Sequence, residues 1–186
     1  MSLVYGGAEE LVVKGYVDAS FNTDPDDSKS QTGYLFILNG PAVSWRSSKQ
    51  SIVAASTCEA EYVAASEASR EGVWMKAFTT DLGVIPSVLD PMEIYCDNTG
   101  AIANTKEPRS HKNSKHIQLR YHIIREYVKK GDIVVSKVHT AHNAADPLTK
   151  PLPREKHEKH LEAMALVGKG LSIGPYVSGA PNFMRH

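Results

Sequence analysis

The first quarter of the chain consists of short runs in which β-branched and aromatic residues dominate. Two such runs, Leu11 to Phe21 and Thr32 to Leu38, predict strands. Asn39 and Gly40 follow the second run, and this dipeptide favours a hairpin turn because Asn and Gly best tolerate a positive φ. A return strand is therefore expected from Ala42 to Arg46, so that three antiparallel strands come first.

A long segment with helical periodicity follows, from Ser56 to Leu82. Ser56 and Glu59 have the spacing of a capping box, in which side chains satisfy the N–H groups at the start of a helix. In the second half of the segment, large apolar residues recur at helical spacing and predict a buried stripe. The residues of this stripe are Val73, Trp74, Ala77, Phe78 and Leu82. Gly83 is expected to end the helix.

Strands and helices alternate in the rest of the chain. The predicted elements are a strand over 92–96, a short helix over 98–104, a helix over 116–129, a strand over 133–138, a helix opening over 143–150 and a helix over 154–167. Three strands followed by this alternation predict an α/β fold, with a mixed sheet and helices on its faces.

The composition fits one globular domain. The chain has 186 residues, of which 41% are hydrophobic and 23% charged, so it can bury a core of ordinary size. We expect a lead-in over residues 1–10, the domain over 11–167, and a poorly ordered tail over 168–186, where glycine and proline recur.

Charge and cysteine content restrict the class of protein. The 21 Lys and Arg residues balance the 21 Asp and Glu residues, so any affinity for nucleic acid must come from a local basic patch. Cys58 and Cys96 are far apart in sequence and indicate neither a zinc site nor a disulfide framework, which favours a reduced, intracellular setting. No apolar run reaches transmembrane length and Met1 to Leu3 lacks a signal-peptide core, so no membrane partner is expected.

Four acidic residues occupy positions where chemistry is expected. Asp97 directly follows the strand 92–96, Asp18 lies in the first strand, Glu61 lies in the long helix, and Asp146 follows the last apolar run. Strand ends at the rim of an open α/β sheet commonly bind ligands. Carboxylate oxygens suit hard divalent cations, and two such cations can clamp the attacking and leaving oxygens of a phosphodiester. The alternative is four solvated surface acids and helix caps.

Several short runs occur in the order that characterises a known family. They are Gly15 to Phe21, Ser56 to Ala64, Cys96 to Asn98, Ser114 to Ile117, Arg120 to Glu126 and Asn143 to Lys150. Across residues 3 to 166, the chain resembles the ribonuclease H domain of copia-type LTR retrotransposon Pol polyproteins. The resemblance implies a ribonuclease H-like fold, with a five-stranded mixed sheet of strand order 3-2-1-4-5 flanked by helices. It also implies an origin at the carboxyl end of a polyprotein that carries protease, integrase and reverse transcriptase.

The resemblance also implies an activity. Members of this family are metal-dependent endonucleases that hydrolyse the RNA strand of RNA–DNA hybrids during reverse transcription and leave 3′-hydroxyl and 5′-phosphate ends. The implied cofactors are two Mg²⁺ ions, with Mn²⁺ as a substitute. The implied partners are an RNA–DNA hybrid and the polymerase part of the same polyprotein, in a cytoplasmic virus-like particle or the nucleus.

Carried over by position, the family's catalytic and metal-binding residues fall on the four acids. Asp18 would bridge both metals, Asp97 would bind the second metal with Asp18 and Glu61, and Asp146 would bind the first metal beside the attacking water. Glu61 matches the family's Glu-aromatic-x-Ala pattern, but Glu59 is a rival because residues two apart on a helix lie on different faces. Without metal the carboxylates would repel one another, so at least one pKa should be raised.

Related cellular and retroviral enzymes often have a histidine in the loop before the last aspartate. This chain offers His139 and His142, although copia-type relatives commonly lack a histidine there. We expect His142, which is nearer to Asp146 in the sequence, to be an auxiliary catalytic group; a solvated loop histidine is the alternative.

Substrate contacts are expected from two groups of residues. Lys112, Lys115 and Arg120 belong to a basic stretch that could follow the phosphates of a hybrid, or could be a solvated face. Ser20 and Asn98 could contact RNA 2′-hydroxyls, or could be capping groups.

Two alternatives to a nuclease use the same fold. One is a non-catalytic domain of the reverse transcriptase that binds or tethers the hybrid. The other is an integrase-like core, which uses its acids in the order Asp, Asp, Glu, whereas this chain has Asp, Glu, Asp, Asp.

Overall fold

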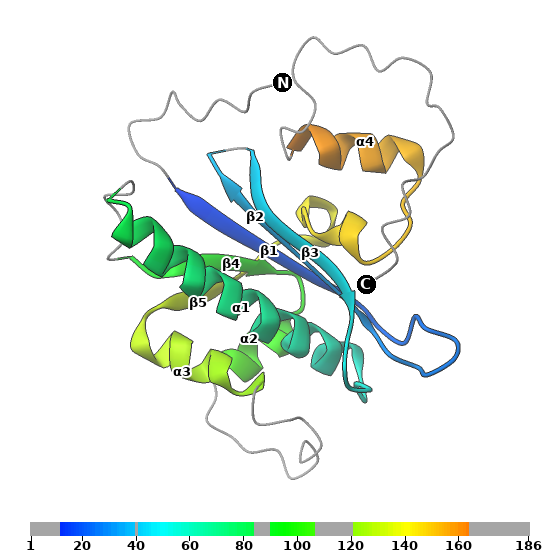
Figure 1. Ribbon diagram of the computed structural model, residues 1–186. Coiled ribbons are helices and arrows are strands. Elements are labelled where there is room, and N and C mark those ends of the chain that lie inside the picture. The colour runs from blue at the N-terminus through cyan, green and yellow to red at the C-terminus, as the bar shows by residue number, and fades with distance from the viewer. Residues whose placement is uncertain (1–11, 40, 84–89, 107–120, 164–186) are drawn as a thin grey trace.

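The computed structural model describes residues 12–39, 41–83, 90–106 and 121–163 (Figure 1). These residues form the strands β1 (Val13–Ser20), β2 (Gln31–Leu38), β3 (Ala42–Lys49), β4 (Met92–Cys96) and β5 (Ile133–Lys137). They also form the helices α1 (Thr57–Asp81), α2 (Thr99–Lys106), α3 (Ile123–Lys130) and α4 (Arg154–Ala163), and the short 3₁₀ turns η2 (Thr140–His142) and η3 (Asp146–Leu148).

The five strands form one mixed sheet in the order β3-β2-β1-β4-β5. The pairs β1–β2 and β2–β3 are antiparallel, whereas β4 is parallel to both β1 and β5. The predicted fold class and strand order are therefore confirmed. Because β1 and β4 are parallel neighbours, their carboxyl ends lie at the same edge of the sheet.

The sheet separates two layers. Helices α1, α2 and α3 lie on one face, and η2, η3 and α4 lie on the other (Figure 1). Residues alternate between these faces along each strand, so that Val17 and Phe36 pack in the main core whereas Leu35 packs with Ala144 in a smaller one.

The predicted start of α1 is confirmed. Ser56 is the N-cap residue, and its side chain accepts a hydrogen bond from the Glu59 N–H. The buried stripe predicted for the second half of the helix is wrong, because Trp74, Phe78 and Leu82 are 58%, 47% and 57% exposed. Of the predicted stripe, Val73 packs against the main core, as a partly buried residue.

Gly72 and Met75 are the buried residues of this second half. A Cβ atom on Gly72 would lie 3.2 Å from Ile133 Cδ1, so the helix backbone comes close to the sheet at this point. The missing side chain at Gly72 therefore leaves room for Ile133, Met92 and Phe36 of the sheet.

Three other boundaries differ from the predictions. β3 continues to Lys49, because the segment expected to be a connection pairs with β2 as far as Gln31. The segment 143–150 forms the 3₁₀ turn η3, which has Pro147 near its start, and not a regular helix. The helix predicted from His116 begins at Ile123 within the described residues.

Several predictions fall outside the described residues. They concern the lead-in, the whole tail, and the basic residues Lys112, Lys115 and Arg120. Within the described residues, none of the helices combines the length and the apolar character needed to cross a membrane. Cys58 and Cys96 are free thiols.

Candidate active site

Two aspartates lie at the edge of the sheet where β1 and β4 end. Asp18 is near the carboxyl end of β1 and is 2% exposed, and Asp97 directly follows Cys96, the last residue of β4. Asp18 comes one residue after Val17, which packs in the main core, so its side chain points to the face that carries η3. The strand pairing thus brings together two carboxylates that are far apart in the sequence.

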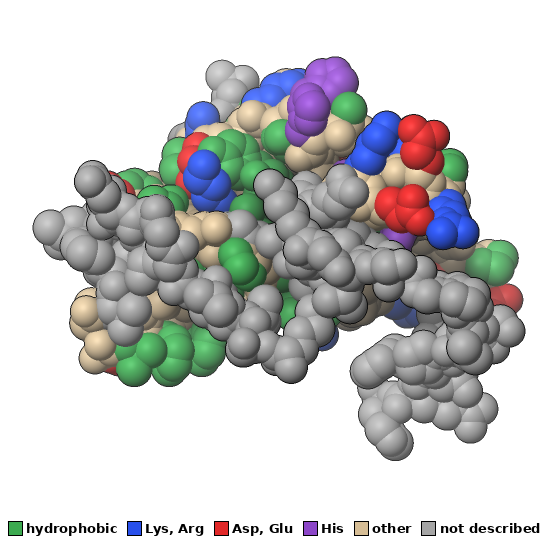
Figure 2. Space-filling view, turned by 90° about the horizontal axis from the view of Figure 1, so that it is seen from above, with side chains coloured by type: hydrophobic (Ala, Val, Ile, Leu, Met, Phe, Trp, Pro, Cys, Tyr) green, Lys and Arg blue, Asp and Glu red, His purple; other side chains and the backbone are tan. Residues whose placement is uncertain are grey.

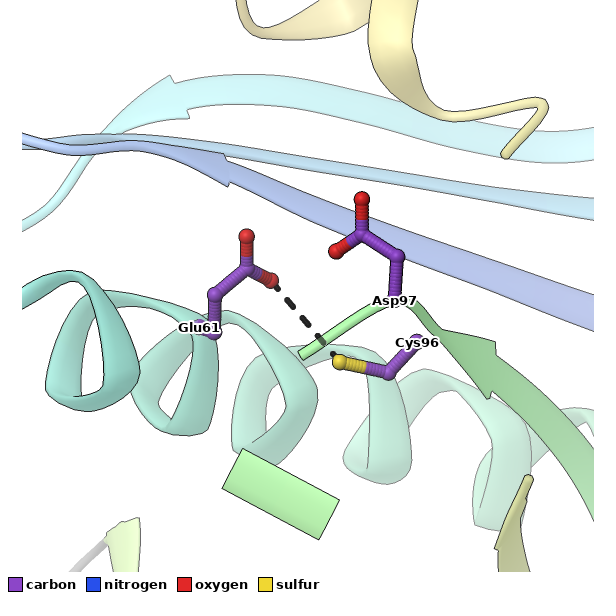
Figure 3. A group of neighbouring side chains, drawn as sticks. All are labelled: Glu61, Cys96 and Asp97. Carbon is purple, nitrogen blue, oxygen red and sulfur yellow. Dashed lines mark hydrogen bonds between the residues drawn. The ribbon is translucent and has the colours of Figure 1, made fainter. Parts of the chain in front are cut away.

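Glu61 approaches this edge from α1. Its Oε1 accepts a hydrogen bond from the backbone N–H of Ala19 at 3.2 Å, and its Oε2 accepts one from the Cys96 thiol at 3.9 Å. The candidate ligand atoms of Glu61, Cys96 and Asp97 all lie within 4.8 Å of one another. Figure 3 shows the Glu61 and Asp97 carboxylates above the Cys96 thiol, in the space between α1 and the end of β4.

The structure gives Glu59 and Glu61, between which the sequence could not choose, different hydrogen-bond partners. The Glu59 carboxylate accepts a hydrogen bond from the Ala55 N–H at 2.7 Å, and its own N–H donates to Ser56 Oγ at 3.2 Å. Glu59 therefore stabilises the start of α1 by hydrogen bonds, whereas the Glu61 side chain points to the aspartates. The geometry favours Glu61 for any role in the carboxylate cluster.

Asp146 reaches the same place from the other face of the sheet, as the first residue of η3. The preceding loop is fixed by Asn143, whose Nδ2 donates to Val17 O at 2.9 Å and whose Oδ1 accepts from Ala145 N at 3.2 Å. Gly33 of β2 lets η3 come close, because a Cβ atom there would lie 2.7 Å from a methyl carbon of Thr149. Asp146 is consequently 8% exposed.

Thr149 and Lys150 complete the cluster, and the sequence-based assignment had given them no role. The Thr149 hydroxyl donates a hydrogen bond to Asp18 Oδ2. The Lys150 ammonium lies 3.8 Å from Asp18 Oδ2 and forms an ion pair with Asp146 Oδ1. Two features of the sequence could have indicated a role for Lys150. It follows Asp146 by four residues, and both lie in the last run that resembles the family.

Burial and mutual repulsion control the protonation of the cluster. Burial, together with the charges of Asp18 and Asp97, raises the pKa of Glu61 to about 8. Burial also raises the pKa of Asp18, against the opposing effects of Thr149 and Lys150. The predicted increase in at least one pKa is therefore confirmed. Burial and the Glu61 charge raise the pKa of the Cys96 thiol, so this sulfur stays protonated and is a poor ligand for a hard cation.

The donor set fits divalent cations. Asp18, Glu61, Asp97 and Asp146 offer oxygen atoms, which Mg²⁺ and Mn²⁺ prefer. Glu61 and Asp18 are buried carboxylates whose negative charge is disfavoured without further positive charge. A cation bound among them would remove that cost, so the cluster can hold a divalent metal.

The two histidines lie beside this cluster on an open groove of about 670 Å³. The groove lies between η2, η3 and α4, and it is lined by His139, His142, Asp146, Lys156, Lys159 and His160, among others. His139 caps η2 by accepting a hydrogen bond from Ala141 N at 3.2 Å. On the face of the molecule that includes α4, histidine side chains gather near lysine and arginine side chains (Figure 2). His142 shares the groove with Asp146, and its auxiliary role stays a prediction.

The predicted substrate contacts have a mixed outcome. Asn98 is a capping residue, because its Oδ1 accepts a hydrogen bond from Ala101 N at 3.0 Å at the start of α2. Ser20 is the last residue of β1, two residues after Asp18. Contact of either residue with RNA stays a prediction, and the three basic residues lie outside the described part of the chain.

Comparison with known proteins gives relatives for most of the chain. It is 45% identical over 156 residues to the Retrovirus-related Pol polyprotein from transposon TNT 1-94 of Nicotiana tabacum, which covers 84% of this chain and 11% of the polyprotein. It is 41% identical over 144 residues to the Retrovirus-related Pol polyprotein from transposon RE2 of Arabidopsis thaliana, which covers 77% of this chain and 10% of that polyprotein. The chain thus spans about a tenth of the length of these curated relatives. No family model matches it.

A solved structure shows the same fold at low sequence identity. It is LC11-RNase H1, isolated from compost by a metagenomic approach, with a TM-score of 0.54 and 17% identity. The match covers 81% of this chain and 98% of that one. At this identity the likeness concerns the arrangement of strands and helices.

Proposed function

Since the chain belongs to the copia-type retrotransposon Pol polyproteins, as a homologue of one segment with the ribonuclease H fold, we propose that it is an endonuclease that hydrolyses the RNA strand of RNA–DNA hybrids during reverse transcription. One observation carries this proposal. Carboxylates from β1, α1, the end of β4 and η3 converge at one edge of the sheet, in the chain order Asp18, Glu61, Asp97, Asp146.

The cofactors are two Mg²⁺ ions, for which Mn²⁺ can substitute. Asp18, Glu61 and Asp97 would hold one ion, and Asp18 and Asp146 would hold the other. When bound, the ions supply positive charge beside the attacking and leaving oxygens of the phosphodiester. The buried, mutually repelling carboxylates support this assignment, because such a group of acids is stabilised by added positive charge.

The chain's own residues position these carboxylates. The Ala19 N–H fixes the Glu61 carboxylate, and Asn143 fixes the loop that presents Asp146. A water molecule then attacks the phosphorus in line with the leaving 3′-oxygen, which gives 3′-hydroxyl and 5′-phosphate ends. Preorganised ligands avoid reorganisation at the moment of reaction, and for this reason the site uses side chains anchored on strands and helices.

Other residues assist around this centre. His142, on the groove that Asp146 lines, is an auxiliary group that helps the product to leave. Ser20 and Asn98 contact the RNA strand, while Lys112, Lys115 and Arg120 contact phosphates of the hybrid. The polymerase part of the polyprotein is the partner that delivers the hybrid, in a cytoplasmic virus-like particle or the nucleus.

The direct test is cleavage of a hybrid whose RNA strand carries an end label, in the presence of Mg²⁺ or Mn²⁺. Asp97→Asn should lower the rate roughly a thousandfold, equivalent to about 4 kcal/mol of transition-state stabilisation, because it removes a negative ligand at a metal-dependent centre. Asp81→Asn is the matched control, because Asp81 is an exposed residue at the far end of α1. This variant should cleave the hybrid at the same rate as the unmodified protein.

Three results would contradict the proposal. Unchanged cleavage by Asp97→Asn would refute the site assignment. Hybrid binding without cleavage by the unmodified protein would favour a tethering domain. Joining of duplex DNA ends in a strand-transfer assay would favour an integrase-like core.

A further inference from the structure

The segment that presents Asp146 also presents a cation. Asp146, Thr149 and Lys150 lie within five consecutive residues, and all three meet the carboxylate cluster. The Lys150 ammonium contacts carboxylates from two separate elements, Asp18 of β1 and Asp146 of η3. Among the described residues, both ion pairs of the cluster are made by this one side chain.

The exposure of the three side chains shows how this contact is built. The Asp18 and Asp146 side chains are 3% and 11% exposed, whereas the Lys150 side chain is 39% exposed. The ammonium therefore reaches the two buried carboxylates from the solvent side. A lysine has a flexible four-carbon stem and a compact charge, so it can leave such a position without any movement of the backbone.

The position of the ammonium is one where a metal ion is also needed. Lys150 offsets part of the negative charge of Asp18 and Asp146, the pair that the proposed function assigns to one of the two divalent cations. An ammonium and a divalent cation cannot both contact this pair at short range, because their like charges repel.

We infer that Lys150 is a resident counter-ion of the carboxylate cluster, which holds Asp18 and Asp146 together in the metal-free protein and is displaced when a divalent cation binds. This inference rests on the proposed function, because it concerns the same metal site. Lys150 is then a positioning residue. It stabilises the cluster before metal arrives, and it weakens metal binding by the work needed to displace it.

The test compares Lys150→Met, which keeps an unbranched side chain of similar length and removes the charge, with Lys150→Arg, which keeps the charge. Calorimetry gives the dissociation constant for Mn²⁺, and thermal unfolding in EDTA gives the stability of the metal-free protein. Lys150→Met should bind Mn²⁺ about tenfold more tightly, since one competing charge is gone, and should melt at a lower temperature without metal. Lys150→Arg should stay close to the unmodified protein in both measurements.

Lys130→Met is the matched control, because Lys130 is an exposed lysine at the end of α3. It should change neither measurement. A second measurement does not depend on a variant: the side-chain ¹⁵N signal of Lys150 in the unmodified protein should shift on addition of Mg²⁺. This signal decides the question if Lys150→Met does not fold.

The outcomes separate the inference from the function on which it rests. If the unmodified protein binds neither Mn²⁺ nor Mg²⁺, the metal site itself is refuted. If it binds metal, and Lys150→Met binds Mn²⁺ equally or more weakly, the counter-ion role is refuted and the metal site stands. A Lys150 signal that does not move on metal binding refutes displacement in the same way.

Discussion

The two halves of α1 differ in which side chains they bury. In the first half most residues are buried, including the acidic residues Glu59 and Glu61. In the second half, Trp74 and Phe78 are 58% and 47% exposed. One half buries charge and the other exposes aromatic rings, so the hydrophobicity of single residues did not decide where they lie. The number of elements that surround each half decided it.

The first half of α1 has neighbours on several sides. In this half, Cys58 accepts a hydrogen bond from Asn104 of α2, and Tyr62 contacts His122 and Arg125 at α3, while a series of small residues is buried. These residues are Ala60, Ala64, Ala65, Ser66, Ala68 and Ser69. A carboxylate placed here loses water, and this loss gives Glu61 its raised pKa.

The second half of α1 meets the sheet through one narrow face. The Trp74 and Phe78 rings stack at a centroid distance of 5.3 Å and line an open apolar groove of about 500 Å³. Val13 and Leu38, near the opposite end of β1 from the carboxylate cluster, also line this groove. The helix thus joins a polar, buried end of the molecule to an apolar, exposed one.

Removing one aromatic ring from each half of α1 tests whether the two halves differ in packing. Tyr62→Ala should lower the free energy of unfolding by about 4 kcal/mol, because Tyr62 is 2% exposed and packs in the main core. Phe78→Ala is the matched truncation on the same helix and should cost about 1 kcal/mol or less. Urea unfolding measures both. Equal losses would show that the two halves do not differ in packing.

A second test uses the charge buried in the first half. In the folded protein the pKa of Glu61 is about 8, above the value of 4.5 for the unfolded chain, so the folded state binds more protons between these pH values. Stability of the metal-free protein should therefore fall as the pH rises from 4.5 to 8. Glu61→Gln cannot ionise, so its advantage in EDTA should be near zero at pH 4.5, grow as the pH rises, and level off above about pH 8.

Thermal unfolding at several pH values measures this difference. Glu126→Gln, on the exposed side of α3, is the control and should follow the unmodified protein at every pH. A gain from Glu61→Gln that is the same at pH 4.5 and pH 9 would show that the Glu61 charge is not the cause.

The smallest expected effect concerns the start of the first half. Ser56→Ala removes the side chain that accepts a hydrogen bond from the Glu59 N–H, and it should lower stability by about 1 kcal/mol. Thr57→Ala is the control, because Thr57 is an exposed residue of the first turn. Chemical denaturation distinguishes the two, and an equal loss from both variants would rule out the cap as the cause.

Local patterns in the sequence predict the order of the strands and helices, and its motifs indicate the acids of the carboxylate cluster. Local alternation and turn residues predicted β1, β2 and β4 within one or two residues, and the resemblance to a family implied the strand order β3-β2-β1-β4-β5. The motifs also point to the four acids Asp18, Glu61, Asp97 and Asp146. These features depend on neighbouring residues or on motifs, both of which a sequence contains.

The tertiary structure decided which face of each element is used. The choice between Glu59 and Glu61 depends on the rotation of α1 against the sheet, and the wrong prediction of a buried stripe at Trp74 and Phe78 has the same origin. The place of Lys150 beside both Asp18 and Asp146 depends on how η3 packs against β1. These two aspartates are 128 residues apart in the sequence. Periodicity along a chain shows that a helix has an apolar face; only contacts between distant segments fix what that face meets, because burial is a property of the packed whole.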